Sequence, residues 1–326
     1  MRPLGSLQCG MRPWFSEKRE QFMLEIEAQK SYANFGLSRS LRQIKHAFHN
    51  RQQLDESMVA LLDLVKESEY RMQRQLGKKV EQLRMLEIGP GQGLERARYF
   101  GRKNKVVGMD LDVIPVGFDV RSYARMWREN GAGRVAKSIG RRLLIGYANE
   151  RAWSSLLGVD KFKNPTLIHG NICEEPPSIG QFDVIMSWSV FEHLPNPEQA
   201  LHNVIKLLKP GGIFYLSLHL YTSNNGHHDI RAFTGNEDNL PLWAHLRPST
   251  QAVIAPSAYL NQWRLAQWRE LFTTVTPDHR EILEAFESYE RFQPQMTAAI
   301  RQELAEYTDE ELYTINAVYA WRKPDA

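Results

Sequence analysis

Residues 86–93 read Leu86-Glu87-Ile88-Gly89-Pro90-Gly91-Gln92-Gly93, a short apolar strand that runs into a glycine-rich turn. Glycine has no Cβ, so the backbone of such a turn can approach a ligand closely. The helix that follows presents free backbone N–H groups at the same point. A dinucleotide fingerprint, Gly-x-Gly-x-x-Gly, needs a third glycine at position 94, where Leu94 stands. The spacing therefore argues against a pyrophosphate-binding turn and against a nucleotide-dependent oxidoreductase.

An acidic residue follows the turn at the spacing expected for a ribose contact. Asp110 ends the apolar segment 105–110, 21 residues after Gly89. An acid at the end of a second strand can accept hydrogen bonds from both hydroxyls of a ribose. Asp112 is a nearby alternative for the same contact. The turn and the acid together predict a nucleoside-binding edge.

Short apolar strands alternate with helices along most of the chain. Strands are expected at 85–88, 105–110, 166–169, 182–187, 213–218 and 313–321, and helices near 94–100, 197–208 and 258–271. Alternation of this kind is typical of a mostly parallel sheet covered by helices on both faces. The pattern predicts an α/β, doubly wound fold.

Several of these segments resemble the motifs of class I S-adenosylmethionine-dependent methyltransferases. They are the glycine turn, Val107-Gly108-Met109-Asp110, Gly170-Asn171-Ile172, the run from Phe182 to Leu194, and Leu208-Lys209-Pro210-Gly211-Gly212. The resemblance covers roughly residues 84–218. It implies a Rossmann-like, seven-stranded sheet and S-adenosylmethionine as the cofactor.

The same resemblance implies a role for each matching residue. Glu87, Gly89, Gly91 and Gly93 would surround the methionine and ribose portions of the cofactor. Asp110 would hold the ribose, with Leu111 against the adenine. Asn171 and Ile172 would flank the adenine, and Ser187 would lie near the methyl-bearing end.

Two further parts complete the expected organisation. Residues 1–83 read as an N-terminal helical extension, with one helix between Ser16 and Gly36 and another from Asp55 to Gly77. Residues 84–326 form the expected methyltransferase domain. It contains a basic helical insertion, 113–165, with ten Lys/Arg against four acids, so that this stretch carries +6 and the remainder of the +3 chain carries −3. The insertion is interpreted as a solvated lid, with an anionic acceptor, a nucleic-acid backbone or a peripheral membrane contact as alternatives.

Histidines gather after the fifth strand, in the segment from His219 to Asp229. If the methyl acceptor is a hydroxyl, a general base must take its proton, and imidazole has a suitable pKa. The base is predicted to be His219 or His228, with Asp229 orienting it. His193 is interpreted as ordering the exit of the fourth strand. No metal site is expected, because adjacent histidines such as His227 and His228 project in different directions.

The preferred function is methyl transfer to a hydroxyl of a small molecule or sugar, in the manner of bacterial enzymes that modify surface glycans. The alternatives are a nucleic-acid methyltransferase, disfavoured because Ser187-Trp188-Ser189-Val190 lacks an Asn/Asp-Pro-Pro-Tyr motif, and a non-catalytic interaction protein. No run of about 18 apolar residues predicts a transmembrane helix. Two isolated cysteines, Cys9 and Cys173, fit a reducing cytoplasm. The oligomeric state is not indicated.

Overall fold

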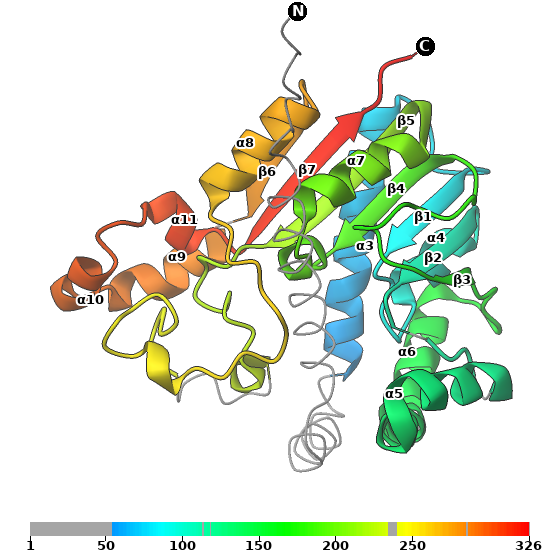
Figure 1. Ribbon diagram of the computed structural model, residues 1–326, viewed down its shortest axis with the longest axis horizontal. Helices are drawn as coiled ribbons and strands as arrows, with labels where there is room; N and C mark the ends of the chain where they lie inside the picture. Colours follow the sequence, from blue (N-terminus) through cyan, green and yellow to red (C-terminus); the bar gives the residue numbers. More distant parts are fainter. Residues whose placement is uncertain (1–53, 113, 118, 234–239, 285, 326) are drawn as a thin grey trace, which may run out of the picture.

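The computed structural model describes residues 54–112, 114–117, 119–233, 240–284 and 286–325. Seven strands form one sheet: β1 (Arg84–Ile88), β2 (Lys105–Asp110), β3 (Thr166–His169), β4 (Phe182–Trp188), β5 (Leu208–His219), β6 (Arg280–Glu284) and β7 (Asn316–Arg322). Their spatial order is β3-β2-β1-β4-β5-β7-β6 (Figure 1). β7 runs antiparallel to both of its neighbours, and the other pairs are parallel. The predicted seven-stranded α/β fold is confirmed, with a mixed sheet.

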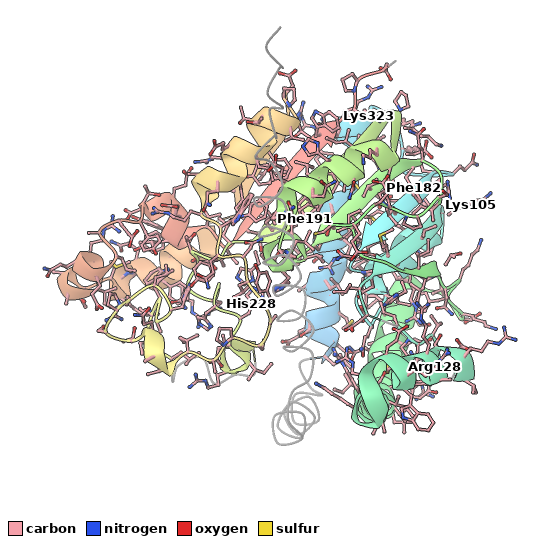
Figure 2. The ribbon with its side chains drawn as sticks, in the orientation of Figure 1. Lys105, Arg128, Phe182, Phe191, His228 and Lys323 are labelled. Atoms are coloured by element: carbon pink, nitrogen blue, oxygen red, sulfur yellow. The ribbon has the colours of Figure 1, made fainter. Side chains whose placement is uncertain are left out.

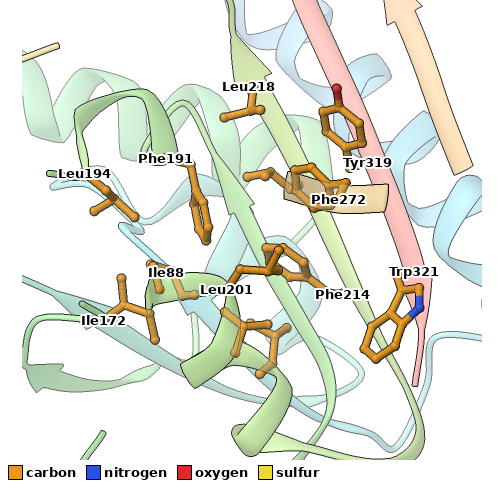
Figure 3. Packing of buried hydrophobic residues seen from close by; sticks show 14 of the residues in the cluster. Ile88, Ile172, Phe191, Leu194, Leu201, Phe214, Leu218, Phe272, Tyr319 and Trp321 are labelled. Atoms are coloured by element: carbon orange, nitrogen blue, oxygen red, sulfur yellow. The ribbon is translucent and has the colours of Figure 1, made fainter. Parts of the chain in front are cut away.

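Helices cover both faces of the sheet because its strands are apolar on both sides. α7 (Pro197–Leu207) and α8 (Leu265–Val275) pack on one face, in a cluster with Phe214, Leu216 and Leu218 of β5. Figure 3 shows Phe214 and Leu218 in this cluster. α3 (Leu54–Leu76), α4 (Glu95–Gly101) and α6 (Tyr147–Leu157) pack on the other, against Ile213 and Tyr215. The central strands β1, β2, β4, β5 and β7 therefore contribute alternate side chains to two cores.

The long connections lie between and after these elements. The insertion between β2 and β3 is helical, as predicted, and consists of α5 (Val120–Arg141), a π-helical turn over Arg142–Gly146, and α6. After β5 come short turns at Ile230–Phe233 and Gln251–Val253. α9 (Phe286–Phe292), α10 (Ala298–Glu303) and α11 (Asp309–Tyr313) separate β6 from β7. They pack with Trp243 in a small third cluster.

The predicted helix over 258–271 is wrong in its first seven residues, because α8 begins only at Leu265. Gln262 has a φ of 59°, which a helix does not tolerate. The side chain of Asn261 instead donates to the carbonyls of Phe191 and Leu194, at 2.8 and 3.1 Å. This segment is thus fastened to the exit of β4 rather than wound into a helix.

The N-terminal extension is described only from Leu54. α3 ends at Leu76, and Gly77 has the positive φ of 69° that is common after helices. Met58, Leu62, Val65 and Met72 enter the core on the sheet. The helix predicted between Ser16 and Gly36 lies outside the described residues, and the division of the chain at residue 84 stays a prediction. Within the described ranges, no helix is long and apolar enough to cross a membrane.

Candidate functional site

The sheet reverses its strand order between β1 and β4. In open α/β sheets, ligands bind beyond the carboxyl ends of the strands at such a point. The register brings Ile88 beside Met109 and Ser187, and Asp110 beside His169. Figure 2 shows His228 on this side of the sheet, whereas Lys105 and Phe182, the first residues of β2 and β4, mark the opposite edge. The predicted cofactor and catalytic residues therefore meet at one edge.

The glycine turn adopts a backbone that only glycine tolerates well. Gly89 and Gly91 have φ values of 67° and 65°. The Gly89 N–H donates to the carbonyl of Met109 at 2.8 Å, which fastens the turn to β2. A Cβ on Gly89 would stand 2.3 Å from a methyl carbon of Val190, whereas a Cβ on Gly91 would meet nothing within 4 Å. Gly89 thus packs against the exit of β4, and Gly91 faces open space.

A buried acid, Glu87, and a half-buried acid, Asp110, flank this turn. Glu87 is 2% exposed, and one of its carboxylate oxygens, Oε2, accepts no hydrogen bond from the described residues. Burial raises the pKa of Glu87 to about 7, against the attraction of Arg96. Burial also raises the pKa of Asp110 to about 6, although its Oδ1 accepts the N–H of Asp112 at 2.8 Å. The ionised form of both carboxylates is stabilised when a ligand supplies hydrogen-bond donors or positive charge.

The insertion reaches the site through a residue that the sequence did not single out. Arg134 of α5 lies 2.6 Å from a carboxylate oxygen of Asp112, close to Asp110 and the half-buried Leu111. A basic residue 22 positions away on an insertion gives no sequence signal for this contact. The basic helix therefore borders the predicted ribose and adenine position.

The remaining predicted cofactor residues differ in what their side chains do. Ser187 is fully buried and donates to the carbonyl of Ile88 at 3.1 Å, so it ties β4 to β1. Ile172 belongs to the core. Asn171 caps its own loop, because its Oδ1 accepts the N–H of Cys173 at 3.0 Å and its amide donates to Glu174 at 3.3 Å. Gly93 lies in the turn, where a Cβ would meet the carboxylate of Glu95 at 2.0 Å.

Three histidines from three segments converge beyond β4 and β5. The ring of His228 lies 4.8 Å from that of His219 and 4.8 Å from that of His193. His219 ends β5, and His193 ends the 3-10 turn Phe191–His193 after β4. Glu192 joins them, because its Oε1 accepts the backbone N–H of His219 at 3.4 Å. The two predicted candidate bases are thus neighbours in one cluster.

Burial controls the charge of this cluster. It lowers the pKa of His219 to about 4 and that of His228 to about 2, and it lowers the pKa of His193. It raises the pKa of Glu192 to about 8. The imidazoles are therefore neutral near pH 7, where each can accept a hydrogen bond or bind an ion through a lone pair.

The hydrogen bonds of His193 and His219 fix their tautomers. His193 Nδ1 lies 2.7 Å from the carbonyl oxygen of Tyr259, which can only accept, so Nδ1 carries the proton. His219 Nε2 lies 3.2 Å from the hydroxyl of Ser223, which already donates to the carbonyl of Leu220. His219 therefore donates from Nε2 and carries its lone pair on Nδ1.

Asp229 does not orient either histidine in this structure. Its carboxylate accepts two hydrogen bonds from the Arg231 guanidinium, at 2.6 and 3.0 Å, and one from the backbone N–H of Ala255 at 2.8 Å. These contacts outweigh burial and lower its pKa to about 2. The expected Asp229–histidine pair is corrected to an Asp229–Arg231 ion pair that shapes the loop.

Sequence reasoning did not identify Glu192 and His193 as a candidate functional pair. An acid and a histidine shortly after a buried strand carried a signal, because the apolar neighbours in Val190-Phe191-Glu192-His193-Leu194 favour burial of the carboxyl. Trp243 is fully buried and donates to the carbonyl of Leu312 at 3.1 Å. It supports the C-terminal helices.

Comparison with known proteins gives one family match. A family model described as a methyltransferase domain matches residues 63–272, which is more than half of the chain. A Mycolicibacterium smegmatis protein named "Probable S-adenosylmethionine-dependent methyltransferase" is 30% identical over 125 residues, 38% of this chain. That match spans 47% of the relative, so less than half of its length is covered.

Solved structures with a similar arrangement of elements include two methyltransferases. The plantazolicin methyltransferase BpumL, in complex with SAH, is 14% identical with a TM-score of 0.46, over 95% of this chain and 99% of that chain. Phosphoethanolamine N-methyltransferase 2 of Haemonchus contortus, in complex with S-adenosyl-L-methionine, is 17% identical with a TM-score of 0.41, over 79% of this chain and 53% of that chain.

Proposed function

Because the chain belongs to the methyltransferase domain family, we propose that it transfers the methyl group of S-adenosylmethionine to a hydroxyl of a small molecule or sugar. The observation that carries this proposal is the cluster of neutral histidines beside the glycine turn. A hydroxyl is a weak nucleophile that benefits from a nearby base, and neutral imidazole supplies one.

The methyl donor is S-adenosylmethionine, as in the name of the Mycolicibacterium smegmatis relative. When bound, it supplies an activated methyl group on a sulfonium. The residues at the edge of the sheet fit this molecule. Asp110 would accept hydrogen bonds from the ribose hydroxyls, the buried Glu87 would face the positively charged methionine portion, and Gly91 would leave room for close approach. Leu111, Asn171 and Ile172 would flank the adenine.

The chain's own residues align the acceptor and move its proton. In the transfer, the acceptor oxygen forms a bond to the methyl carbon as the sulfur–carbon bond breaks, and a thioether leaves. The acceptor's proton passes to an imidazole. His219 is suited to receive it at Nδ1, because its Nε2 proton is held by Ser223. His228 is the second candidate for this role.

The structure supports a nucleic-acid substrate less well than a hydroxyl of a small molecule or sugar. Several basic side chains of the insertion already pair with acids: Arg125 with Glu129, Arg134 with Asp112, and Arg142 with Glu150, at 2.6–2.9 Å. Pairing reduces the charge available to phosphates. Trp127 on α5 is 64% exposed. An exposed aromatic side chain on a basic helix is suited to a membrane surface, so a peripheral membrane contact stays a second proposal for the insertion. A sugar of a surface glycan stays the narrower proposal for the acceptor.

A methyl-transfer assay with labelled S-adenosylmethionine and a panel of sugars, catechols, amines and RNA tests the acceptor class. We expect label in hydroxyl compounds. His219→Gln is expected to lower kcat by about 10²-fold or more while leaving cofactor affinity unchanged. His202→Gln, at an exposed histidine of α7, is the matched control. Full turnover in His219→Gln would rule out His219 as the general base. Transfer to amines or RNA alone would contradict the proposed acceptor class.

A further inference from the structure

Three side chains that commonly bind metals meet at the exits of β4 and β5. Glu192, His193 and His228 each place one ligand atom within 4.8 Å of the other two. They come from two segments 35 residues apart in the chain. Val190, two residues before Glu192, packs against Gly89 of the glycine turn. The group therefore lies next to the predicted cofactor position.

Glu192 has a carboxylate that the protein alone leaves poorly satisfied. The residue is 2% exposed, and its Oε2 accepts no hydrogen bond from any described residue. Its Oε1 receives only a long contact, 3.4 Å, from the His219 N–H, besides its own backbone N–H. A buried carboxylate is costly unless it is paired with a cation or coordinates a metal. No Lys or Arg pairs with it in the described part of the chain.

His193 is held as metal-binding histidines usually are. Such a histidine donates one ring N–H to a carbonyl or carboxylate and binds the ion through the other nitrogen. His193 donates from Nδ1 to Tyr259, at 2.7 Å, which leaves the lone pair on Nε2. The Tyr259 segment is itself fastened to the exit of β4, since the Asn261 N–H donates to the carbonyl of Glu192 at 2.9 Å.

The backbone of His228 is also fixed. It has a φ of 49°, which is unfavourable for histidine, and its carbonyl accepts both the N–H and the hydroxyl of Ser257, at 2.9 and 2.6 Å. A strained backbone persists where its surroundings hold it. These bonds set the direction in which the imidazole leaves the loop.

We propose that Glu192, His193 and His228 bind a divalent transition-metal ion of the zinc type, with open positions toward the methyl acceptor. Two imidazoles and one carboxylate form a donor set used by catalytic zinc and related ions, whereas Mg²⁺ prefers oxygen ligands. Ligands of a tetrahedral zinc ion lie about 3.4 Å apart, so small side-chain movements close the present 4.8 Å spread. The sequence argument against a metal considered His227 with His228, whereas this site combines His228 with a distant pair.

The consequence for methyl transfer rests on the proposed function. An acceptor hydroxyl bound to the ion would have a lowered pKa and a fixed orientation. His228 would then be a ligand, which leaves His219 to take the proton. An acceptor with two neighbouring oxygens could occupy two open positions.

Metal binding is tested on the full chain after chelator treatment, by titration with Co²⁺ followed through its visible absorption and by competition with Zn²⁺. We expect one equivalent to bind to the wild type. Glu192→Gln, His193→Gln and His228→Gln should each weaken binding at least about tenfold. Glu198→Gln and His202→Gln, at exposed positions of α7, are the matched controls and should bind like the wild type.

Thermal unfolding separates a ligand role from a structural one. Without metal, Glu192→Gln should melt at or above the wild-type Tm, because it removes a buried charge; with Zn²⁺, only the wild type and the controls should gain Tm. No binding by the wild type at about 1 mM ion, or unchanged binding in all three variants, would overturn the site. Titration of the same samples with S-adenosylmethionine keeps the two proposals distinct, because cofactor binding without metal binding leaves the proposed function standing.

Discussion

Asp110 and Glu87 are acids that the fold keeps where a carboxylate is costly. Asp110 ends β2 and Glu87 lies near the end of β1, so both are placed by the sheet rather than by mobile loops. Burial raises their pKa values to about 6 and about 7. Free energy lost in this way without a ligand is recovered when a ligand supplies matching donors or charge.

This arrangement predicts a pH-dependent cofactor affinity. Below about pH 6 the free protein holds protons on both acids, and binding must release them because the cofactor is held by carboxylates. Affinity should therefore rise from about pH 5.5 to pH 8, by up to tenfold per pH unit for each proton released. Calorimetric titration with S-adenosylmethionine across this range measures it. Asp110→Asn should flatten the lower part of the profile, and a constant wild-type affinity would contradict the assignment.

Two glycines with positive φ make it possible to distinguish the effect of backbone strain from the loss of a ligand contact. Gly91 and Gly158 have φ values of 65° and 62°, and a Cβ on either would meet nothing within 4 Å. Gly158 is the C-cap residue of α6 and is not among the predicted cofactor contacts. Alanine at either position should lower the free energy of unfolding by about 1 kcal/mol. Only Gly91→Ala should also weaken S-adenosylmethionine binding, by about tenfold or more, because its Cβ would occupy the cofactor's approach. Equal affinities for the two variants would remove Gly91 from the site.

Sequence reasoning could predict the positions of residues that a strand end fixes. Glu87, Asp110, Ser187 and His219 all stand at ends of β-strands, and parallel strands present these ends at one edge. Partners set by long loops could not be predicted. Asp229 follows His228 directly, yet Arg231 and Ala255 take its carboxylate. Spacing along the chain does not reveal such competition.

At the scale of elements, periodicity predicted the strands of the core with small errors. β2 and β3 have the predicted bounds, and β4 is longer by Trp188. β6 was not predicted, because Arg280-Glu281-Ile282-Leu283-Glu284 has too few apolar residues for a buried strand and lies at the sheet's edge. The start of α8 was predicted too early because the spacing of apolar residues does not reveal the left-handed backbone of Gln262.

α3 belongs energetically to the sheet, although it was predicted as part of an extension. Met72 is fully buried in the core beneath β5 and β7, whereas Tyr70 on the same helix is 54% exposed. Met72→Ala should lower the free energy of unfolding by about 2–5 kcal/mol, and Tyr70→Ala should change it by about 0.5 kcal/mol or less. Urea denaturation measures both. Equal losses would show that α3 contributes little to the core.

The whole molecule combines a familiar sheet with less predictable additions. The sheet covered by helices on both faces follows from the alternation of strands and helices, whereas its seven strands were implied by the resemblance to a known family. The contact of the insertion with Asp112 and the meeting of Glu192, His193 and His228 depend on how long connections return to the sheet. We propose that those connections contact the acceptor, which would explain why the sequence indicates the cofactor more readily than the acceptor.

The central claim is that the edge formed by the glycine turn and Asp110 binds S-adenosylmethionine. Calorimetric titration of the purified chain with S-adenosylmethionine and, in parallel, with NAD tests it most directly. We predict about micromolar binding of S-adenosylmethionine alone, lost in Asp110→Ala but kept in Asp160→Ala, an exposed acid of the insertion. Binding of NAD instead, or of neither molecule, would contradict the claim.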